Sequence, residues 1–336
     1  MLSRRSFLAL SAAAALGSSL DLQAEAAETA SWKQITGSNP PSPRWDHTLS
    51  ADIDRERLIV TLGRDDAGIA LGDSFVADRA TGDWQPIEST APGARFGHAV
   101  AVDRAGDTLY LFGGQNADAF FNDLWALNLE SLSWELIDDG ASGPTPRYGT
   151  SLVFDEAGGL IVSHGFTFEG RLDDTWRFDT ESLIWTDVSP APETRPLRRC
   201  LHEAVWNAST SSMWLYGGCS SGYGPCPQGD LWEFRDGIWA SIEAPGPTGR
   251  MNPALIYDRA LDSLLLFGGQ TEAGRANDLW LGNGDSLTWN QISTDFAPEA
   301  RSSHDAVYSA SAVYMFGGLT ASGAANDLWR LKLSDS

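Results

Sequence analysis

A short phrase recurs along this chain of 336 residues: an apolar run ends in Gly-Gly and is followed by Asn-Asp-Leu-Trp. Its clearest copies have their second glycine at Gly114, Gly269 and Gly318. An arginine after a Pro-rich turn marks the same register six times, at intervals of 51 or 52 residues: Arg44, Arg95, Arg147, Arg199, Arg250 and Arg301. A period near fifty residues is typical of propeller blades. The spacing therefore predicts six units.

Each unit contains four segments with strand character, separated by turn signals. A second tryptophan marks the fourth segment, but this series starts at Trp32, before the first arginine, and is missing after the last. We therefore expect residues 31–35 to supply the missing strand of the last unit and to close the ring, which removes exposed sheet edges. The predicted blades cover about 44–87, 95–137, 147–188, 199–242, 250–292, and 301–333 plus 31–35.

The repeated unit combines an arginine shortly after a proline, a histidine three residues later, a double glycine, an aromatic residue and a tryptophan. This pattern resembles the kelch-repeat family over about residues 31–333. The resemblance implies an all-β fold, a six-bladed kelch β-propeller of four-stranded antiparallel blades. Some units depart from the pattern: Gly63 is a single glycine, Phe75 stands where the others have Trp, and His164 replaces the first glycine of its pair.

Most repeated residues are predicted to be structural. The two tryptophan series should bury aromatic surface between successive sheets. An aspartate lies two residues before each strand-three aromatic, and we expect it to hydrogen bond to the repeat arginine or to cap loop amides. These residues are Asp73, Asp123, Asp174, Asp230, Asp278 and Asp327. Four histidines at one equivalent position are interpreted as packing residues, namely His47, His98, His202 and His304, whereas His164 is expected to be an ordinary turn residue.

Residues 1–26 have the features of a targeting segment rather than of a fold. Arg4 and Arg5 precede an apolar stretch, residues 8–16, that is too short to span a bilayer, and small residues lie near Ala26. The segment resembles a twin-arginine export signal, with a mobile basic terminus as the alternative. We expect the mature chain, 27–336, to be a single propeller domain, periplasmic or extracellular, without membrane insertion.

The charge of the chain is one-sided, with 45 acidic against 23 basic residues and a net charge of −22. Such a chain repels phosphate backbones and anionic lipid surfaces. Nucleic acid is therefore excluded as a partner class, and we expect a monomer.

The three cysteines fall in the fourth unit, and an oxidising compartment favours a disulfide between two of them. Cys219–Cys226 would close a local loop, and Cys200–Cys219 would join the ends of a hairpin. The local closure is slightly preferred, but the sequence leaves both open, together with a thiolate metal or redox site that includes His202. We predict no metal site and no cofactor.

Positions that differ between otherwise regular repeats are where we expect a propeller to carry the residues that determine ligand specificity. These positions gather at a predicted channel mouth, and the candidate ligand-binding residues are Trp45, Asp46, Arg64, Phe96, Gln115, Tyr148, Met251, Asn252 and Gln270. Aromatic faces can stack on sugar rings or apolar side chains while polar groups fix orientation. Loop aromatics strengthen this hypothesis: Phe120, Phe121, Phe166, Phe168 and Tyr223. Alternatively, the aromatics plug the channel.

The leading hypothesis is an exported binding module for a protein or carbohydrate ligand at this mouth. The alternative is a small sugar-active enzyme that resembles sialate mutarotases and uses a carboxylate and an arginine. A copper oxidase of the galactose oxidase type is the weakest hypothesis, because the required two tyrosines and two histidines are not identifiable here. No catalytic residue is assigned.

Overall fold

The computed structural model describes residues 30–90, 92–283 and 288–333. In these ranges the regular structure is β-strand, apart from one short 3-10 turn, η1 (Pro192–Thr194). The all-β prediction is therefore confirmed. None of the described segments forms a helix long and apolar enough to cross a membrane. The twin-arginine segment and its cleavage site lie outside the described residues.

Three four-stranded antiparallel sheets make up the first half of the chain. The first sheet contains β2 (Thr48–Asp52), β3 (Arg57–Thr61), β4 (Ser74–Asp78) and β5 (Trp84–Pro86). The second contains β6 (Ala99–Asp103), β7 (Thr108–Phe112), β8 (Leu124–Asn128) and β9 (Ser133–Asp138). The third contains β10 (Ser151–Phe154), β11 (Gly159–Thr167), β12 (Gly170–Asp179) and β13 (Ile184–Asp187).

Three more four-stranded sheets follow in the same order. The fourth contains β14 (Glu203–Asn207), β15 (Ser212–Tyr216), β16 (Leu231–Arg235) and β17 (Ile238–Ile242). The fifth contains β19 (Ala254–Asp258), β20 (Ser263–Phe267), β23 (Leu279–Asn283) and β24 (Trp289–Ile292). The sixth contains β25 (Asp305–Ser309), β26 (Ala312–Thr320), β27 (Gly323–Leu333) and β1 (Ala30–Ile35). A small sheet beside the fifth combines β18 (Arg250–Met251), β21 (Gln270–Thr271) and β22 (Gly274–Arg275).

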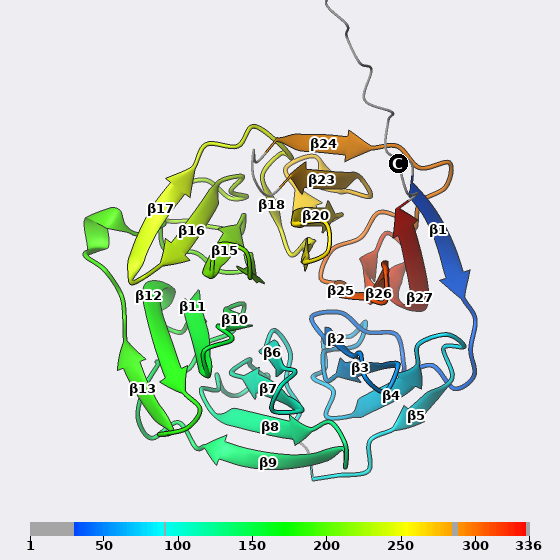
Figure 1. Ribbon diagram of the computed structural model, residues 1–336, viewed down its shortest axis with the longest axis horizontal. Coiled ribbons are helices and arrows are strands. Elements are labelled where there is room, and N and C mark those ends of the chain that lie inside the picture. Colours follow the sequence, from blue (N-terminus) through cyan, green and yellow to red (C-terminus); the bar gives the residue numbers. More distant parts are fainter. Residues whose placement is uncertain (1–29, 91, 284–287, 334–336) are drawn as a thin grey trace, which may run out of the picture.

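Figure 1 shows these sheets arranged around a central axis, with the first strand of each sheet innermost. Each innermost strand contacts the innermost strands of both neighbouring sheets, and β2 contacts β25. The axis is therefore surrounded by six strands: β2, β6, β10, β14, β19 and β25. The space between them is called the channel below.

The sixth sheet is built from both ends of the described chain. β1 pairs antiparallel with β27, so that Trp32 lies opposite Leu331 and Ala30 opposite Leu333. This pairing places residues 31–35 on the outer edge of the last sheet, beside the end of the chain (Figure 1).

The core lies between successive sheets rather than inside any one of them. A middle strand such as β3, which reads Arg-Leu-Ile-Val-Thr, is buried on both faces because a neighbouring sheet covers each face. Strand-four tryptophans reach the aromatic residue that ends strand two of the preceding sheet: Trp32–Phe267 at 4.9 Å, Trp84–Phe316 at 5.1 Å, Trp185–Phe112 at 5.4 Å and Trp289–Tyr216 at 6.2 Å between ring centroids. This series therefore joins sheet to sheet, as predicted.

The strand-three tryptophans also pack between sheets, as predicted. Trp329 is buried in such a cluster, and Trp125, Trp232 and Trp280 are partly buried against others. In addition, the indole nitrogens of Trp125 and Trp176 donate to aspartates of their own sheets, and so take part in the polar frame described next.

Candidate functional site

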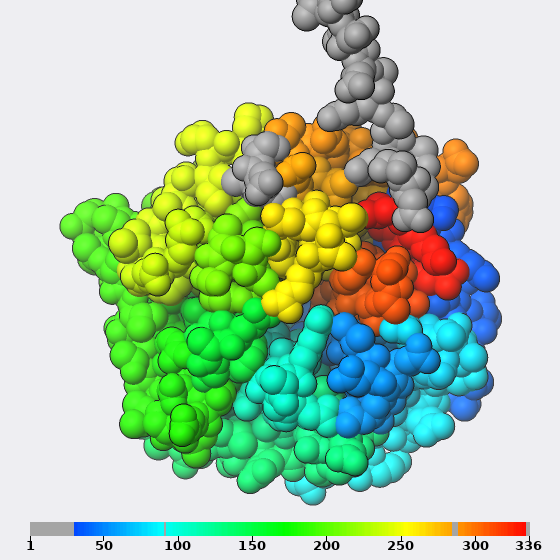
Figure 2. Space-filling model, in the orientation of Figure 1, coloured from blue at the N-terminus to red at the C-terminus, as the bar shows by residue number. Residues whose placement is uncertain are grey.

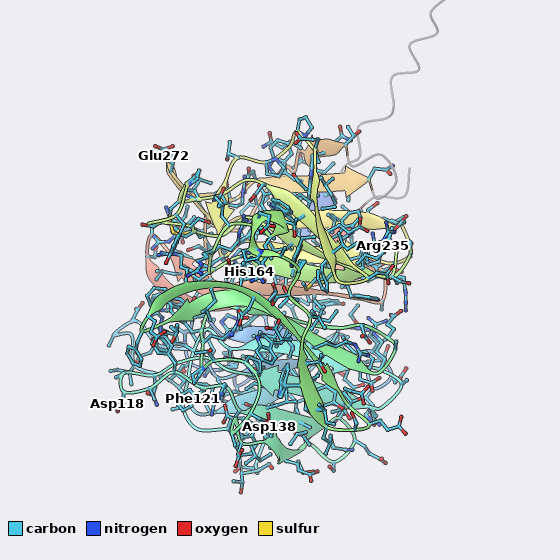
Figure 3. All side chains as sticks on the ribbon, turned by 90° about the vertical axis from the view of Figure 1, so that its left-hand side faces the viewer. Asp118, Phe121, Asp138, His164, Arg235 and Glu272 are labelled. Carbon is cyan, nitrogen blue, oxygen red and sulfur yellow. A yellow bond between two sulfur atoms is a disulfide. The ribbon has the colours of Figure 1, made fainter. Side chains whose placement is uncertain are left out.

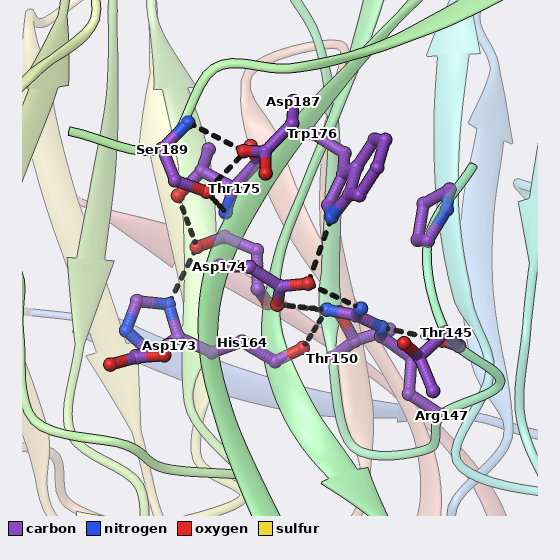
Figure 4. A network of polar contacts seen from close by, with 12 residues as sticks. Thr145, Arg147, Thr150, His164, Asp173, Asp174, Thr175, Trp176, Asp187 and Ser189 are labelled. Carbon is purple, nitrogen blue, oxygen red and sulfur yellow. Dashed lines mark hydrogen bonds and ion pairs between the residues drawn. The ribbon is translucent and has the colours of Figure 1, made fainter. Parts of the chain in front are cut away.

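A buried arginine opens each repeat and ties together the strands of its own sheet. In the third sheet, Arg147 Nη1 donates to the carbonyl of His164 at 3.0 Å and to Asp174 Oδ1 at 2.6 Å, and Nη2 donates to Asp174 Oδ2 at 2.8 Å. Asp174 Oδ2 also accepts a hydrogen bond from Trp176 Nε1 at 2.8 Å (Figure 4). The predicted pairing is confirmed in all six sheets: Arg44–Asp73, Arg95–Asp123, Arg147–Asp174, Arg199–Asp230, Arg250–Asp278 and Arg301–Asp327.

Four of these aspartates, namely Asp174, Asp230, Asp278 and Asp327, are held in the ionised state. Burial raises the pKa of Asp174, but the hydrogen bonds from Arg147 and Trp176 outweigh it and hold the pKa below its usual value. The pKa values of Asp230, Asp278 and Asp327 are lowered by the same balance of forces. Since both partners are satisfied within the sheet, this set is structural and offers no free acid to a ligand.

A ring of backbone hydrogen bonds narrows the channel at the level just beyond the arginines. Each residue two positions after a repeat arginine donates its N–H to the equivalent carbonyl of the preceding sheet, at 2.8 to 3.0 Å. The ring residues are Asp46, Gly97, Gly149, Leu201, Asn252 and Ser303, and Asp46 donates back to Ser303. All six have positive φ, between +46° and +61°, a conformation that is uncommon outside glycine. We call this level of the molecule the arginine end of the channel.

At the arginine end, each residue directly after a repeat arginine pairs with the residue that follows the double-glycine position. The pairs are Trp45–Arg64, Phe96–Gln115, Tyr148–Phe166, Cys200–Cys219, Met251–Gln270 and Ser302–Leu319. The glycines permit this close approach: Gly114 has a φ of +94°, and a Cβ there would lie 3.0 Å from the carbonyl oxygen of Phe96. The sequence-predicted residues thus occupy equivalent places around one rim.

Arg64 is the charged centre of one part of this rim. Its guanidinium lies 3.4 Å from the ring centroid of Trp45 and 4.1 Å from that of Phe96, and it forms an ion pair with Asp46 at 2.6 Å. Burial raises the pKa of Asp46, and the charge of Arg64 reverses this only in part. Trp45 Nε1 donates to the carbonyl of Asp65 at 3.0 Å. Both charges are therefore satisfied within the protein.

Beside this cluster lies a group of aromatic side chains from the second and third sheets. The Phe120 ring stacks on Tyr148 at 5.7 Å and meets Phe168 edge-on at 4.3 Å, and Tyr148 meets Phe166 at 5.7 Å. We call these four residues the aromatic group. Phe168 is 78% exposed.

The remaining loop aromatics serve the frame. The Phe121 ring lies 4.0 Å from the Arg95 guanidinium, and Tyr223 lies near Arg198. Figure 3 places Phe121 and Asp118 at the same end of the molecule as Glu272, with Arg235 at the opposite end.

Three predicted site residues lie in another part of the rim, on the fifth sheet. Met251 Sδ is 3.7 Å from Cys226 Sγ, Asn252 Nδ2 donates to Ser303 Oγ at 2.8 Å, and Gln270 Nε2 donates to the carbonyl of Thr271 at 2.9 Å. The partners of these three side chains lie outside the aromatic group. The rim therefore divides into an aromatic part and a polar part.

The cysteines form one disulfide, Cys219–Cys226, which confirms the preferred local closure. Cys200 is free and buried, and its pKa is raised by burial, with Arg171 opposing this. Arg171 Nε donates to the carbonyl of Cys219 at 2.9 Å, so the third sheet holds the disulfide loop of the fourth. Within the described ranges, no three His, Cys, Asp or Glu side chains are placed to bind a metal.

The repeat histidines point into the interfaces between sheets. His47 Nε2 donates to the carbonyl of Phe316 in the sixth sheet at 3.1 Å, and His98 Nε2 lies 2.9 Å from Thr61 Oγ1 in the first sheet. His202 Nε2 lies 3.0 Å from Ser151 Oγ in the third sheet. Burial lowers the pKa of His47 and of His98 to about 3, so both are neutral near pH 7. Their role is packing, as expected from their equivalent positions.

The expectation that His164 is an ordinary turn residue is wrong. His164 lies within β11, is fully buried, and its Nδ1 is 2.6 Å from Ser163 Oγ. Its ring meets those of His202 and Trp239 edge-on, so it fills the interface between the third and fourth sheets. This burial was missed in the sequence analysis because no other unit has a histidine at the equivalent position, where most other units have glycine.

Two carboxyl groups in the channel were missed by the sequence analysis. Asp305 Oδ2 accepts from Leu49 N at 2.7 Å, and burial raises the Asp305 pKa to about 7. Burial also raises the pKa of Glu203 well above its usual value, and the charges of Asp305 and Asp46 add to this. Both line a channel cavity of about 300 Å³. The sequence signal that could have identified these two residues is an acidic residue directly after a repeat histidine.

Comparison with known proteins agrees with this architecture. The KLHDC2/KLHL20/DRC7 Kelch-repeats domain matches residues 18–218 and 202–336. Kelch domain-containing protein 3 of Homo sapiens is 28% identical over 259 residues, which cover 70% of this chain and 64% of that protein. The leucine-zipper-like transcriptional regulator 1 homolog of Drosophila melanogaster is 26% identical over 269 residues, 73% of this chain and 26% of that protein.

The chain thus spans less than two thirds of the length of Kelch domain-containing protein 3, in the human protein and in the Bos taurus protein, of which 63% is covered. The family model nevertheless covers the repeats described above from end to end. With the repeated arginine frame and the four-stranded sheets, this match establishes that the chain belongs to the kelch-repeat family.

Proposed function

We propose that this protein is a six-bladed kelch propeller, with β1 as the outer strand of the sixth blade, that binds a protein partner at the arginine end of its channel. Kelch-repeat domains are protein-interaction modules, and the family match supports a function of this kind. The observation that carries the location is the aromatic group of Phe120, Tyr148, Phe166 and Phe168.

The chemistry of this rim favours an apolar peptide segment as the ligand. Phe168 is 78% exposed and its ring packs against Phe120. Apolar surface is therefore accessible to a ligand, and binding would cost little conformational entropy of the Phe168 side chain. The neighbouring charges do not compete for a ligand because Arg64 and Asp46 neutralise each other. The partner should therefore present an aromatic or aliphatic side chain to the aromatic group.

The test is selection of peptides from a displayed library on purified residues 27–336, followed by affinity measurement. We expect selected peptides to be rich in apolar side chains, and Phe168→Ala and Phe120→Ala to weaken their binding at least about tenfold. Ile238→Ala is the matched control, because Ile238 is 64% exposed and pairs with Arg235 at the opposite end (Figure 3). Peptides that bind the Phe168→Ala and Phe120→Ala variants as tightly as the wild type would contradict the proposal.

We propose further that the protein acts as a monomer outside the cytoplasm after export through the twin-arginine route. The Cys219–Cys226 disulfide supports an oxidising compartment. Replacing Arg4 and Arg5 by lysine should leave the full-length precursor in the cytoplasm when the gene is expressed in a bacterium with this pathway. Fractionation and immunoblotting measure the result, and unchanged export of the double variant would refute this route.

A second candidate, a mutarotase-like sugar enzyme, is favoured by the channel acids alone. A carboxyl group with a pKa of about 7, as in Asp305, suits proton transfer near neutral pH, and the cavity around it measures about 300 Å³. NMR measurement of anomer exchange over a sugar panel tests this activity. Exchange that Asp305→Asn abolishes would support the enzyme, and no exchange with any sugar would reject it.

A further inference from the structure

The opposite end of the channel, where the first two strands of each sheet are joined by turns, contains a second pocket. Figure 2 views this end and shows turns from successive sheets crowding toward the centre. The pocket measures about 490 Å³, which falls within the usual range for small-molecule sites. We call it the turn-end pocket.

One repeat position supplies most of the large apolar walls. The residue seven positions after each repeat arginine is Ala51, Val102, Phe154, Trp206, Tyr257 and Tyr308 in the successive sheets. The last five line the pocket, and four of them are aromatic. The aromatic side chains come from consecutive sheets, the third to the sixth, so they form an arc around one side of the axis. The other lining residues of these strands are aliphatic, including Leu152, Val205 and Ile256.

The charged groups of the pocket are concentrated in the turns. Arg259 Nη2 donates to both carboxylate oxygens of Glu156, at 2.5 and 2.7 Å, and this ion pair joins the fifth sheet to the third. Arg104, from the second sheet, also lines the pocket, and among the described residues its guanidinium has neither a hydrogen bond nor an ion pair.

We propose that the turn-end pocket binds a small aromatic carboxylate, with its planar ring against the arc of Trp206, Tyr257 and Tyr308 and its carboxylate on Arg104. The aromatic arc supplies area for ring stacking, and an arginine pairs with a carboxylate through two parallel hydrogen bonds. Arg104 is the anchor because Arg259 already binds Glu156. Burial and the nearby charge of Arg259 lower the pKa of Arg104, and the carboxylates of Glu156 and Asp54 offset this only in part.

The walls argue against a sugar as the occupant. A pyranose needs several polar partners around its ring, whereas this pocket offers polar side chains only in its turns. The wall hydroxyls already have partners: that of Tyr257 bonds Asp262 at 2.5 Å and Ser209 at 2.9 Å, and that of Tyr308 bonds Ser311 and Asp258. A flat apolar ring fits these walls without leaving polar groups unpaired.

The proposal is independent of the protein-binding function, because the two sites lie at opposite ends of the channel. Phe168→Ala, which should weaken peptide binding at the arginine end, should leave the affinity of the turn-end pocket for its ligand unchanged. Failure of either proposal can thus be recognised separately.

The experiment uses residues 27–336 and titrates 2-naphthoate by calorimetry, with 2-naphthamide as the neutral isostere and glucuronate as the sugar carboxylate. We expect 2-naphthoate to bind at least about tenfold more tightly than either comparison compound. Arg104→Gln should raise its Kd at least about tenfold, and Tyr308→Ala should do the same. Arg104→Lys keeps the positive charge and should reduce the affinity for 2-naphthoate less than Arg104→Gln does. Arg235→Gln, which removes a charge outside the pocket (Figure 3), should have no effect.

Thermal unfolding of each variant separates a binding defect from a folding defect, and Arg104→Gln in an exposed turn should not change Tm. The proposal is overturned if naphthamide binds as tightly as naphthoate, if glucuronate binds more tightly, or if Arg104→Gln keeps wild-type affinity. It is also overturned if no saturable naphthoate binding occurs with the folded protein at millimolar concentration.

Discussion

The third and first sheets hold the repeat arginine in two different ways. In the third sheet the carboxylate of Asp174 accepts from the arginine and from Trp176 Nε1, and its side chain is 22% exposed. In the first sheet Phe75 replaces the tryptophan, and the side chain of Asp73 is 48% exposed. The arginine there gains a bond to Ser42 Oγ at 3.0 Å instead.

The difference shows what the strand-three tryptophan contributes. Its indole N–H occupies the outer lone pairs of the aspartate and shields the ion pair, so the carboxylate is shared between two donors of one sheet. Without the indole, about half of the Asp73 side chain, 48%, stays exposed to solvent. The strand-three tryptophan, which the sequence suggests is a packing residue, therefore also affects the strength of a buried ion pair.

The largest effect should come from removing the carboxylate in each sheet. Asp174→Ala leaves Arg147 buried without its partner and should lower the free energy of unfolding by about 3 to 5 kcal/mol. Asp73→Ala should cost only about 1 to 2 kcal/mol, because its carboxylate is half exposed and Arg44 keeps its bonds to the carbonyl of Leu62 and to Ser42 Oγ. Urea unfolding of both variants measures the difference, and equal losses would show that the two ion pairs are equivalent.

Acid should weaken the interface between the first and second sheets through His98, whose equivalent in the third sheet is Thr150. The folded pKa of His98 is about 3, below its ordinary value, so stability is present above about pH 6.5 and is lost as the pH falls toward 3. Asp305 acts in the opposite sense. Because its pKa is about 7 in the folded protein and 3.8 is its ordinary value, lowering the pH from 7 to 3.8 stabilises the folded state through this group.

Comparison of His98→Gln with the wild type isolates the histidine. Glutamine can still bond to Thr61 but does not titrate, so at pH 5 the wild type should have lost about 2 kcal/mol more than the variant, relative to pH 7.5. Chemical unfolding at the two pH values provides the measurement. Parallel losses in both proteins would mean that His98 does not control acid stability.

Removing the indole donor should reproduce the first-sheet arrangement in the third sheet. Trp176→Phe deletes one hydrogen bond to an ionised carboxylate and should cost about 1.5 kcal/mol. The pKa of Asp174, followed by NMR, should rise at the same time, because one of the groups that lowers it is gone. A loss of stability with no change in this pKa would assign the effect to packing alone.

The reverse substitution should have the smallest effect. Phe75→Trp introduces an indole N–H near Asp73 and should stabilise the protein by about 1 kcal/mol. Thermal unfolding would detect it as a small rise in Tm. A fall in Tm would show that the first sheet has no room for the larger ring.

Much of the frame could be predicted from the sequence, because it repeats. The arginine–aspartate pairs and the contacts of the strand-four tryptophans follow from six aligned copies, and the Cys219–Cys226 pairing follows from a local loop. The channel acids could not be predicted in this way. Glu203 and Asp305 lie far apart in sequence. Both are buried only because their strands come together around the channel axis, which the repeat pattern does not reveal.

The turn-end pocket was missed for a related reason. Its aromatic residues do share one repeat position, but Phe154 and Trp206 lie on strands whose apolar character looks like ordinary core. An inward-facing strand residue and a buried one give the same pattern along a sequence. Burial of His164 was missed because it stands alone in its position.

The pairing of Ala30 with Leu333 has a consequence for how this fold can be handled and attached. Both ends of the described chain lie in the two outer strands of one sheet, on the circumference (Figure 1). Because β27 runs in the same direction as β16, which ends at Arg235, these chain ends lie toward the turn end (Figure 3). A short peptide could join the two ends, and new termini could then be introduced in a turn between sheets. A partner domain fused at either terminus would leave the arginine end of the channel unobstructed.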